Sequence, residues 1–522
     1  LSLDDAIKFF KKENQDFKVD LLSDLKSKGT TKLNPEEAQD IDPNNKDIAS
    51  VYKTGDFVDL CRGPHLINVS GIGAFKIWKL AGAYWRGDEE NAQLQRIYGL
   101  CFETQEELDA HLTMLEEAKK RDHRKLGQEL KLFAHSQLVG SGLPLFTPRG
   151  TIVREQVGSF LWELMKPHGY QRVHIPHLAK SDLYKTSGHW DKFADDIFHV
   201  SSKTSDDEFV LKPMNCPHHT QIYASQMRSY RDLPLRFSEV TSVYRDENSG
   251  QLQGLTRVRS ITQDDAHVFC RPDQVKEESK KIYDIITKFY KAFDMPLSIR
   301  LSVHDEDKMD KYLGGAEVWD KAVGQFEELL KDLKQDYQVD VGEAAFYGPK
   351  IDFVATDAIG REWQLATIQL DFNLPERFEL EYVDSDNEKK RPVMIHRAIL
   401  GSVERFMGVL IEHYEGAFPF WLAPEQIRFV SVGEDFNEKT KEIAKELEEQ
   451  GIRTGFDVSD EGVGKKIRNS AMMKTPWTIV IGAKEVDGED FKVNVFSQDE
   501  DLSISQKDLV KRAMKEAEFP VK

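Results

Sequence analysis

The feature that most constrains the fold is a pair of β-rich runs between residues 237 and 269, joined by a polar loop at residues 246–254. This pattern predicts a long antiparallel hairpin. Because side chains alternate between the faces of a strand, one face gathers a cation, an amide, a carboxylate and an imidazole. These residues are Arg257, Gln263, Asp265 and His267. Alternation alone leaves two interpretations open, a functional face and a face that is only solvated.

The same alternation excludes one tempting pair of metal ligands. His267 and Cys270 are three residues apart, which places them on opposite faces of a strand. We therefore expect that they do not bind one metal ion together.

The composition describes a large globular protein. Its 522 residues suggest three or four domains, and 40% hydrophobic with 31% charged residues excludes disorder or a collagen-like repeat. The net charge of -19 argues against non-specific coating of DNA or anionic membrane, and leaves room for one local basic groove. Four cysteines without a C-x-x-C pair predict a reducing cytoplasm rather than a disulfide framework. No signal peptide or apolar run of membrane-spanning length is visible.

Changes in the pattern of helix-like and strand-like residues divide the chain into four predicted domains or linkers. Residues 1–103 combine a helix, capped by Ser2 and ended by Gly29, with strand-like residues from 51 to 100. Residues 104–132 are interpreted as a helical linker that begins at Thr104, and its charged run as a solvated face rather than an RNA contact.

The two later parts differ in their expected sheets. Residues 133–420 carry strands in adjacent hairpins, which favours an antiparallel sheet, with a helix over 151–168 and a strand over 170–175. Residues 421–522 alternate strand and helix, which predicts a compact α/β domain with a parallel sheet.

Two further segments carry groups that suit chemistry. Residues 214–219 hold a thiol and two imidazoles, although a lone cysteine is more often a small core residue. Residues 394–397 end a strand that leads into Gly401 and a helix start, where small residues and Arg405 suit a phosphate. Spacing alone does not bring Cys216, His267 and His396 together, because local metal signatures need close pairs.

Four blocks of sequence resemble a known family. They are residues 145–176, the hairpin segments 244–247 and 254–259, the helix start 401–406, and the short runs 214–217, 263–267, 346–350 and 393–397. From about Asp4 to its C-terminus the chain resembles the bacterial threonyl-tRNA synthetases, which are class II aminoacyl-tRNA synthetases. The resemblance implies an antiparallel-sheet catalytic domain, a C-terminal α/β anticodon-binding domain and a partial editing-type domain at the N-terminus.

The resemblance also implies a homodimeric cytoplasmic enzyme that uses ATP with Mg²⁺ and one Zn²⁺ per chain to join threonine to its tRNA through a threonyl-adenylate. Residues 145–176 match the motif at the dimer interface. Arg245 and Arg405 would be catalytic, and the zinc ligands would be Cys216, His267 and His396. The implied ATP site is Arg245, Glu247, Arg257, Gln364 and Arg405. The implied amino-acid pocket is Met214, Gln263, Asp265, Tyr347 and Gln369.

A zinc ion has a physical purpose in such a site. Threonine and valine are nearly isosteric, and an apolar pocket separates such a pair by only about a hundredfold. A site built to engage the hydroxyl rejects its absence by roughly 10⁴ to 10⁵. Serine keeps the hydroxyl, so a second, hydrolytic sieve is needed.

The editing-type part departs from the family. Cys61 and His65 match half of the family's reactive cluster, whereas the H-x-x-x-H motif expected upstream is not in this sequence. We interpret the chain as a fragment rather than a natural form without editing. We expect that this polypeptide does not clear seryl-tRNA.

The last domain departs as well. The family's arginines after the final strand are replaced by residues 495–498, which include Phe496. Phe496 suits either base stacking or an ordinary core or edge position, and the second interpretation is favoured.

Two other functions compete with the ligase. A synthetase-like RNA-binding regulator would not need intact phosphate and metal residues, and a class II enzyme for serine or proline would not supply the Cys-His-His set.

Overall fold

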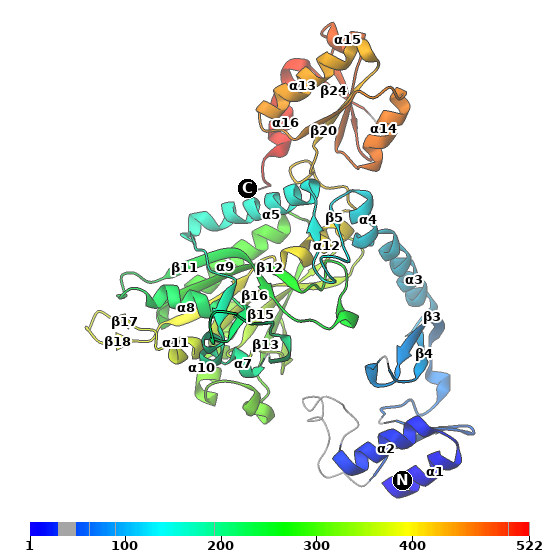
Figure 1. The fold of residues 1–522 in the computed structure, drawn as a ribbon, viewed down its shortest axis with the longest axis vertical. Coiled ribbons are helices and arrows are strands. Elements are labelled where there is room, and N and C mark those ends of the chain that lie inside the picture. The colour runs from blue at the N-terminus through cyan, green and yellow to red at the C-terminus, as the bar shows by residue number, and fades with distance from the viewer. Residues whose placement is uncertain (30–47, 62, 89, 193, 499–500, 521–522) are drawn as a thin grey trace. The chain divides into compact units, whose positions relative to one another are not determined.

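The computed structural model describes all residues except 30–47, 62, 89, 193, 499–500 and 521–522 (Figure 1). The chain divides into two compact units, Leu1–Glu116 and Glu117–Lys522. No helix in the described part has the length and apolar character that crossing a membrane requires.

The first unit is built from small pieces. Its helix α1 begins after Ser2, whose Oγ accepts a hydrogen bond from the Asp5 N–H, as the capping pattern predicts. The single predicted helix is in fact two, because Asn14 adopts a positive φ of 55° between them. The elements of this unit are α1 Leu3–Lys12, α2 Asp16–Lys28, and the antiparallel pairs β1 Val51–Thr54 with β2 Phe57–Leu60 and β3 Ala74–Tyr84 with β4 Gln93–Phe102.

The helix predicted after Thr104 is present as α3, Gln105–Lys120. Thr104 and Glu107 exchange hydrogen bonds in a capping box: each backbone N–H donates to the other's side chain. The charged run that follows is not one helix, because the chain turns at Asp122, which caps α4, His123–Glu129.

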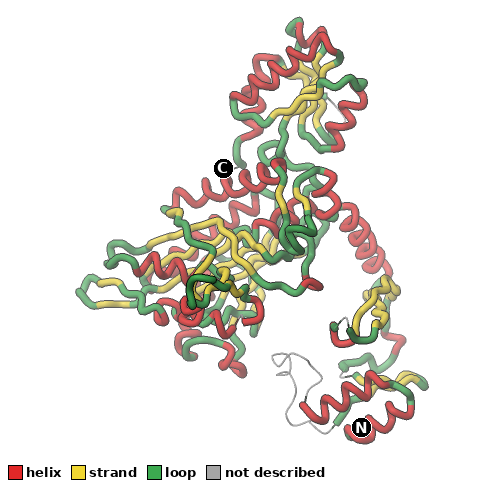
Figure 2. Tube along the Cα trace, in the orientation of Figure 1, coloured by secondary structure: helices red, strands yellow, loops and turns green. Residues whose placement is uncertain are grey.

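The second unit is organised around an eight-stranded sheet, seen near the middle of Figure 2. Its six central strands are antiparallel, as predicted, and only the edge pairs β13 with β14 and β11 with β7 are parallel. The strand order is β14 Gln338–Val341, β13 Leu297–Val303, β15 Lys350–Thr356, β16 Glu362–Asp371, β19 Val393–Ala398, β12 Ser260–Cys270, β11 Leu235–Tyr244 and β7 Gln171–Arg172.

Helices α5 Pro148–Met165, α9 Val275–Lys291 and α12 Val403–His413 share one large hydrophobic core with the sheet. Ala266, Val268 and Cys270 of β12 point into this core, which confirms the predicted alternation. Gln263, Asp265 and His267 therefore lie on the other face. Arg257 does not lie on the strand, because the hairpin loop extends to Arg259 and the alternation does not reach it, but it lines one cavity together with Gln263.

The helix expected over residues 151–168 begins earlier and ends earlier. Thr147 caps α5 and Pro148 occupies its first turn, where a missing N–H costs nothing. Gly150 allows this start to approach a neighbouring loop, since a Cβ there would lie 1.9 Å from the Leu132 carbonyl oxygen. The last predicted turn is a 3₁₀ helix, Lys166–His168, and the following strand shortens to β7.

Other helices of this unit lie around the sheet. They are α6 Ser181–Ser187, α7 His189–Lys192, α8 Cys216–Ala224, α10 Ala316–Asp332 and α11 Asn373–Arg377. The smaller sheets are β5 Phe133–Ala134 with β6 Leu145–Phe146, β17 Tyr382–Val383 with β18 Lys389–Lys390, and β8 Leu178–Lys180, β10 Phe209–Leu211 and β9 His199–Val200.

The C-terminal α/β part has its own hydrophobic core. Its first three strands are parallel, as predicted, whereas the last two continue the sheet antiparallel. The strand order is β21 Thr454–Asp457, β20 Ile427–Ser431, β22 Trp477–Ile481, β23 Phe491–Val495 and β24 Leu502–Ile504. The helices are α13 Asn437–Glu449, α14 Val463–Met472, α15 Ala483–Val486 and α16 Gln506–Ala517.

A fully buried ion pair joins two central strands. The Arg397 Nη1 of β19 donates to Asp264 Oδ1 of β12 at 2.6 Å, and both side chains are 0% exposed. Asp264 Oδ2 also accepts from the N–H groups of Ile399 and Leu400. Removing one partner from such a pair leaves a buried charge without its counter-charge.

We expect Asp264→Asn to lower the free energy of unfolding by about 3 to 5 kcal/mol, because Arg397 would stay buried without its counter-charge. The measurement is urea unfolding followed by tryptophan fluorescence. Asp273→Asn is the matched control: Asp273 pairs with Arg271 at 2.8 Å, but is 67% exposed. Equal effects of the two substitutions would contradict the role given to the buried pair.

Candidate functional site

A row of side chains crosses three adjacent strands because of their register. His267 of β12 lies directly opposite His396 of β19, and His396 lies opposite Gln369 of β16. Asp265 is two residues from His267 on the same face of β12. Strand pairing thus brings together residues that are far apart in the sequence.

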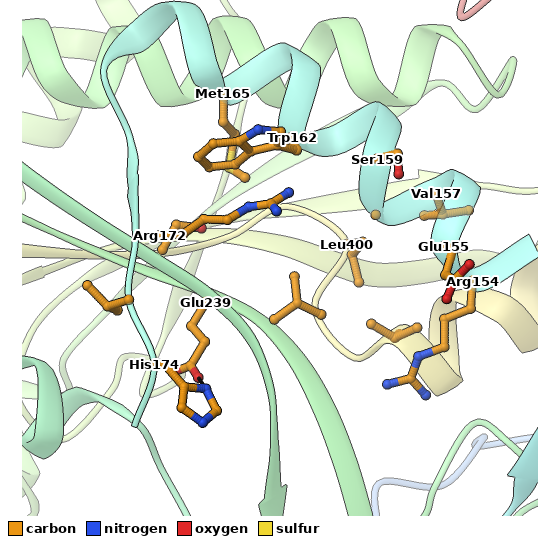
Figure 3. A pocket seen from close by; sticks show the side chains of 15 residues that line it. Arg154, Glu155, Val157, Ser159, Trp162, Met165, Arg172, His174, Glu239 and Leu400 are labelled. Carbon is orange, nitrogen blue, oxygen red and sulfur yellow. Dashed lines mark ion pairs between the residues drawn. The ribbon is translucent and has the colours of Figure 1, made fainter. Parts of the chain in front are cut away.

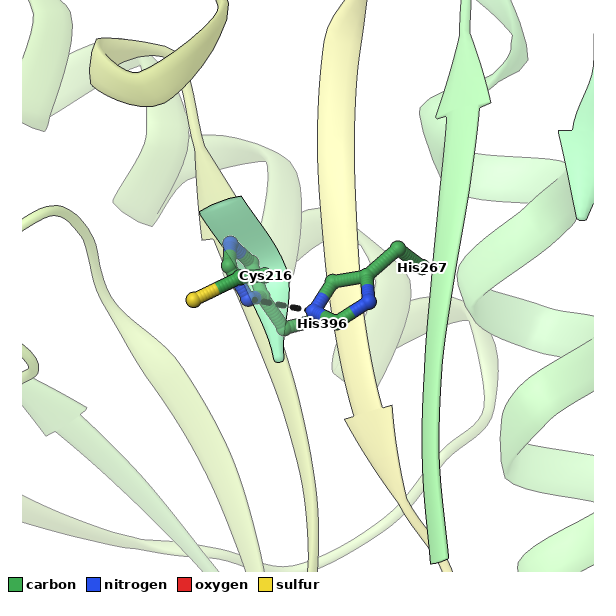
Figure 4. A group of neighbouring side chains, drawn as sticks. All are labelled: Cys216, His267 and His396. Atoms are coloured by element: carbon green, nitrogen blue, oxygen red, sulfur yellow. Dashed lines mark hydrogen bonds between the residues drawn. The ribbon is translucent and has the colours of Figure 1, made fainter. Parts of the chain in front are cut away.

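Cys216 joins this row from the first turn of α8. Cys216 Sγ and one nitrogen each of His267 and His396 all lie within 4.8 Å of one another, and all three residues are buried (Figure 4). His267 Nε2 and His396 Nδ1 are 3.1 Å apart. Beside the thiol, His189 Nε2 lies 3.6 Å from Cys216 Sγ. We call Cys216, His267 and His396 the Cys-His-His group.

The outer partners indicate which ring nitrogens are available for a ligand. His396 Nε2 lies 2.8 Å from Asp371 Oδ2 and His267 Nδ1 lies 2.7 Å from His219 Nδ1. A proton on each of these outer nitrogens leaves His396 Nδ1 and His267 Nε2 as lone-pair donors that face one another. A cation bound between these two nitrogens would relieve the repulsion between their lone pairs.

The donor set fits a tetrahedral metal ion. Bond lengths of about 2.0 Å to nitrogen and 2.3 Å to sulfur separate the ligand atoms by roughly 3.3 to 3.6 Å, which is compatible with the 3.1 Å between the two nitrogens and the 4.8 Å that bounds the whole group. Burial, reinforced by Asp265 and Asp371, raises the pKa of the Cys216 thiol well above its usual range, and burial lowers the pKa of His267. Burial thus favours neutral ligands here, and a bound cation would compensate a Cys216 thiolate.

A second group of possible ligands has a different explanation. His123, Asp122 and Glu412 are also close together. His123 Nδ1 contacts Glu412 Oε1 at 2.6 Å, and its Nε2 accepts from the Leu255 N–H. Both ring nitrogens are used by the protein, so this group holds the hairpin loop rather than an ion.

Polar groups surround the Cys-His-His group. Asn215 Nδ2 donates to Asp265 Oδ2 at 3.0 Å, and burial raises the pKa of Asp265. Tyr347 stacks on the His396 ring with centroids 4.7 Å apart and donates to Gln369 Oε1. The five residues predicted for an amino-acid pocket fall in this region; Gln263 Oε1 lies 3.4 Å from Asn215 Nδ2, and Met214 precedes Asn215.

The residues predicted for nucleotide binding line one cavity of about 420 Å³. It lies between the hairpin loop, β16 and the start of α12. Ser402 caps α12 by accepting from the Arg405 N–H, so this helix N-terminus opens beside the cavity. The five predicted residues are Arg245, Glu247, Arg257, Gln364 and Arg405.

Positive charge dominates this cavity. Burial lowers the pKa of Arg245 and Arg405, but a guanidinium stays charged in proteins. The Arg405 Nε donor is buried and has no partner in the described part of the chain. Arg257 pairs with Glu247, Nη2 to Oε2 at 2.7 Å. The lining thus holds three arginines and one glutamate, a net positive charge that a polyanion would balance.

Another cavity, of about 570 Å³, lies against α5, β7 and β11 (Figure 3). Arg172 stacks over the Trp162 ring at 4.1 Å, and Val240 is 48% exposed. Glu239 closes one side, with its Oε1 3.1 Å from His174 Nδ1. This face combines exposed apolar and charged groups.

Cys61 and His65 lie in the first unit. Cys61 is exposed, and the ring of His65 stacks on Tyr52 with centroids 3.7 Å apart. Neither belongs to a group of three close metal-ligating residues among those described.

Sequence reasoning missed the partners behind the main site. A signal existed for Asp371, which lies two residues after Gln369 on the same strand face. His189, Asn215 and His219 come from helix starts and loops, where spacing gives no direction for a side chain.

Three family models match the chain. Residues 198–414 match the tRNA synthetase class II core domain (G, H, P, S and T). Residues 426–516 match an anticodon binding domain, and residues 49–98 match the threonyl and alanyl tRNA synthetase second additional domain.

Similar proteins share most of this chain. A threonine–tRNA ligase of Porphyromonas gingivalis is 48% identical over 94% of this chain and 72% of that protein, and one of Cytophaga hutchinsonii is 49% identical over 93% and 73%. The crystal structure titled as the RNA binding domain of threonyl-tRNA synthetase from Cryptosporidium parvum has a TM-score of 0.74 at 35% identity, covering 77% of this chain and 99% of that one. A putative threonyl-tRNA synthetase from Aeropyrum pernix has a TM-score of 0.66 at 29% identity, over 77% and 98%.

Proposed function

From the premise that this chain belongs to the threonyl-tRNA synthetase family and is a threonine–tRNA ligase, we propose that it works through a threonyl-adenylate and selects threonine by a zinc ion. The expectation of a ligase is confirmed, and an RNA-binding regulator is not favoured. The class implies ATP with Mg²⁺. The observation that carries the finer proposal is the convergence of the Cys-His-His group beside a cationic cavity.

We propose that the cavity of about 420 Å³ holds ATP. Arg245 holds the α-phosphate, Arg405 the triphosphate and Glu247 the adenine side, while Arg257 and Gln364 supply further contacts. The threonine carboxylate attacks the α-phosphorus and pyrophosphate leaves. Fixed guanidinium groups neutralise the negative charge that this attack must approach, without a proton transfer.

The polar groups around the Cys-His-His group would hold the amino acid. Cys216, His267 and His396 hold the zinc, and Met214, Gln263, Asp265, Tyr347 and Gln369 surround the substrate. When bound, the zinc supplies open coordination for an amino group and a β-hydroxyl, which a methyl group cannot use. Asp265, oriented by Asn215, accepts a hydrogen bond from the substrate's hydroxyl or amino group. Valine would leave these groups unsatisfied, so it is rejected far more strongly than by shape alone.

The first test is threonine-dependent exchange between ATP and pyrophosphate. We expect the zinc-loaded chain to exchange, and Arg405→Lys to lower kcat/KM for ATP by about 10² to 10³, because lysine lacks the planar fork. Arg271→Lys, in an exposed pair with Asp273, is the control. Absence of exchange in the parent chain with zinc present would favour the regulator instead.

The second test concerns the metal. We expect one zinc per chain by elemental analysis, lost in Cys216→Ala because a ligand is removed. Cys101→Ala changes an exposed thiol and should keep the zinc. Discrimination of threonine over valine in the exchange assay should fall from roughly 10⁴ or more towards about 10² in Cys216→Ala. A zinc content that does not depend on Cys216 would sink the proposal.

Homodimerisation and tRNA binding are part of the same proposal. We propose that the face formed by α5, β7 and β11, which includes Trp162 and Val240, pairs with a second copy of this chain (Figure 3). The part matched by the anticodon model binds the anticodon of tRNA(Thr). Phe496 is half-buried and lines a cavity of about 460 Å³ with Trp477 and Phe418. The four unpaired cysteines suit a reducing cytoplasm.

We also propose that editing by this polypeptide is incomplete. The β3–β4 pair exposes one apolar face: Phe75, Ile77, Leu80 and Ile97 are each 59% to 64% exposed. An isolated two-stranded sheet is marginal in water. Cys61 and His65 stand in this unit without a further close histidine pair among the described residues.

Accordingly, seryl-tRNA added to this chain should be hydrolysed no faster than in buffer, because half of the reactive cluster is missing. Deacylation of labelled seryl-tRNA measures the rate, with threonyl-tRNA as the control substrate. Rapid, selective release of serine would show that the remaining residues suffice.

A further inference from the structure

The motif at residues 214–219 contains a histidine that the proposed chemistry leaves unused. His219 is 0% exposed and lies on α8, one turn after Cys216. Its Nδ1 is 2.7 Å from His267 Nδ1, and the two rings meet edge to face with centroids 4.7 Å apart. No other ring nitrogen of the described residues contacts this side of His267.

The contact requires exactly one proton between the two nitrogens. His267 turns its Nε2 towards His396 Nδ1, at 3.1 Å, and that nitrogen must keep a lone pair to act as a metal ligand. His267 therefore carries its proton on Nδ1, and this N–H donates a hydrogen bond to His219 Nδ1. This in turn puts the proton of a neutral His219 on Nε2.

The far side of His219 faces a carboxylate. His219 Nε2 lies 3.9 Å from Glu239 Oε2, and neither atom has a hydrogen-bond partner among the described residues. The distance is too long for a hydrogen bond but leaves a favourable interaction between the N–H and the negative charge in a buried region. Glu239 Oε1 is held separately by the Ile175 N–H at 3.2 Å and by His174. Figure 3 shows Glu239 against His174.

Resting on the proposed zinc site, we propose that His219 is a positioning residue that fixes the tautomer and ring orientation of His267, and that Glu239 fixes the tautomer of His219. The line Glu239, His219, His267 mirrors the contact of Asp371 with His396 on the other ligand. Each metal-ligating imidazole thus has one buried polar partner. Such partners raise ligand basicity and metal affinity.

Glu239, the last residue of this line, also contacts a second cavity of the protein. Glu239 borders the cavity against α5 and β7, and the Ile175 N–H that holds it lies three residues after the end of β7. The orientation of one zinc ligand therefore depends on the backbone at that face.

The test compares two substitutions of similar shape. His219→Leu removes the acceptor, whereas His219→Asn places an amide oxygen where Nδ1 stood. We expect zinc affinity, measured by competition with a chromophoric chelator, to fall about 10- to 100-fold in His219→Leu. His219→Asn should bind several times more tightly than His219→Leu. The visible spectrum of the cobalt(II)-loaded chain should shift in His219→Leu and be restored in His219→Asn.

The neighbouring histidine gives the control. His218 is also buried, but within the part of the chain that the structure describes neither of its ring nitrogens has a hydrogen-bond partner. His218→Leu should leave the zinc affinity unchanged. Parent-like affinity in a folded His219→Leu, or equal losses in the Leu and Asn variants, would overturn the proposal.

Glu239→Gln keeps the test decisive if the His219 variants do not fold. The substitution keeps the shape of the side chain and removes the charge that faces His219 Nε2, so the zinc affinity should fall several-fold. An unchanged zinc affinity would contradict the role given to Glu239. A failure of the proposed zinc site would look different from a failure of this inference. In that case the parent chain and Cys216→Ala would bind equal amounts of zinc.

Discussion

The register between β16, β19 and β12 is the constraint on which the site depends. It sets Gln369, His396 and His267 side by side across the sheet. A slip of one residue in any of these strands would turn its polar side chains into the hydrophobic core. The buried pair of Asp264 and Arg397 opposes such a slip from the other face, because it joins β12 to β19 and satisfies the turn after β19.

The two faces of the sheet therefore have separate tasks. One face buries aliphatic and aromatic side chains against α5, α9 and α12 and supplies stability. The other face carries, beside a smaller apolar cluster that includes Phe269 and Met394, imidazoles, carboxylates and amides that would be costly to bury singly. They are tolerated because each has a partner, such as Asp371 for His396 and Asn215 for Asp265. The same pairing gives the site its rigidity.

The nucleotide cavity depends on different elements. Arg245 and Arg257 come from the hairpin loop, and Arg405 comes from the first turn of α12. His123 holds that loop through the Leu255 N–H and holds α12 through Glu412. One buried side chain thus ties together the two segments that would contact ATP.

Local features of the fold could be predicted from the sequence more reliably than the meeting of residues that are far apart along the chain. Alternation along β12 placed Gln263, Asp265 and His267 on one face, and the capping residues located the starts of α1 and α3. The break at Asn14 was missed because a positive φ at one residue leaves no periodic signal. The meeting of Cys216 with His267 and His396 came only from the family resemblance, since strand register and the direction of α8 are tertiary properties. His219 was noticed as an imidazole, but its direction towards His267 could not be predicted.

The central claim is that Cys216, His267 and His396 share one zinc ion within reach of the substrate's hydroxyl. Anomalous diffraction at the zinc absorption edge, from crystals of the parent chain with threonine, tests this most directly. We expect one strong peak at roughly 2.0 to 2.3 Å from Cys216 Sγ, His267 Nε2 and His396 Nδ1, with the threonine hydroxyl beside it. Fully occupied threonine with no anomalous peak among these three atoms would contradict it.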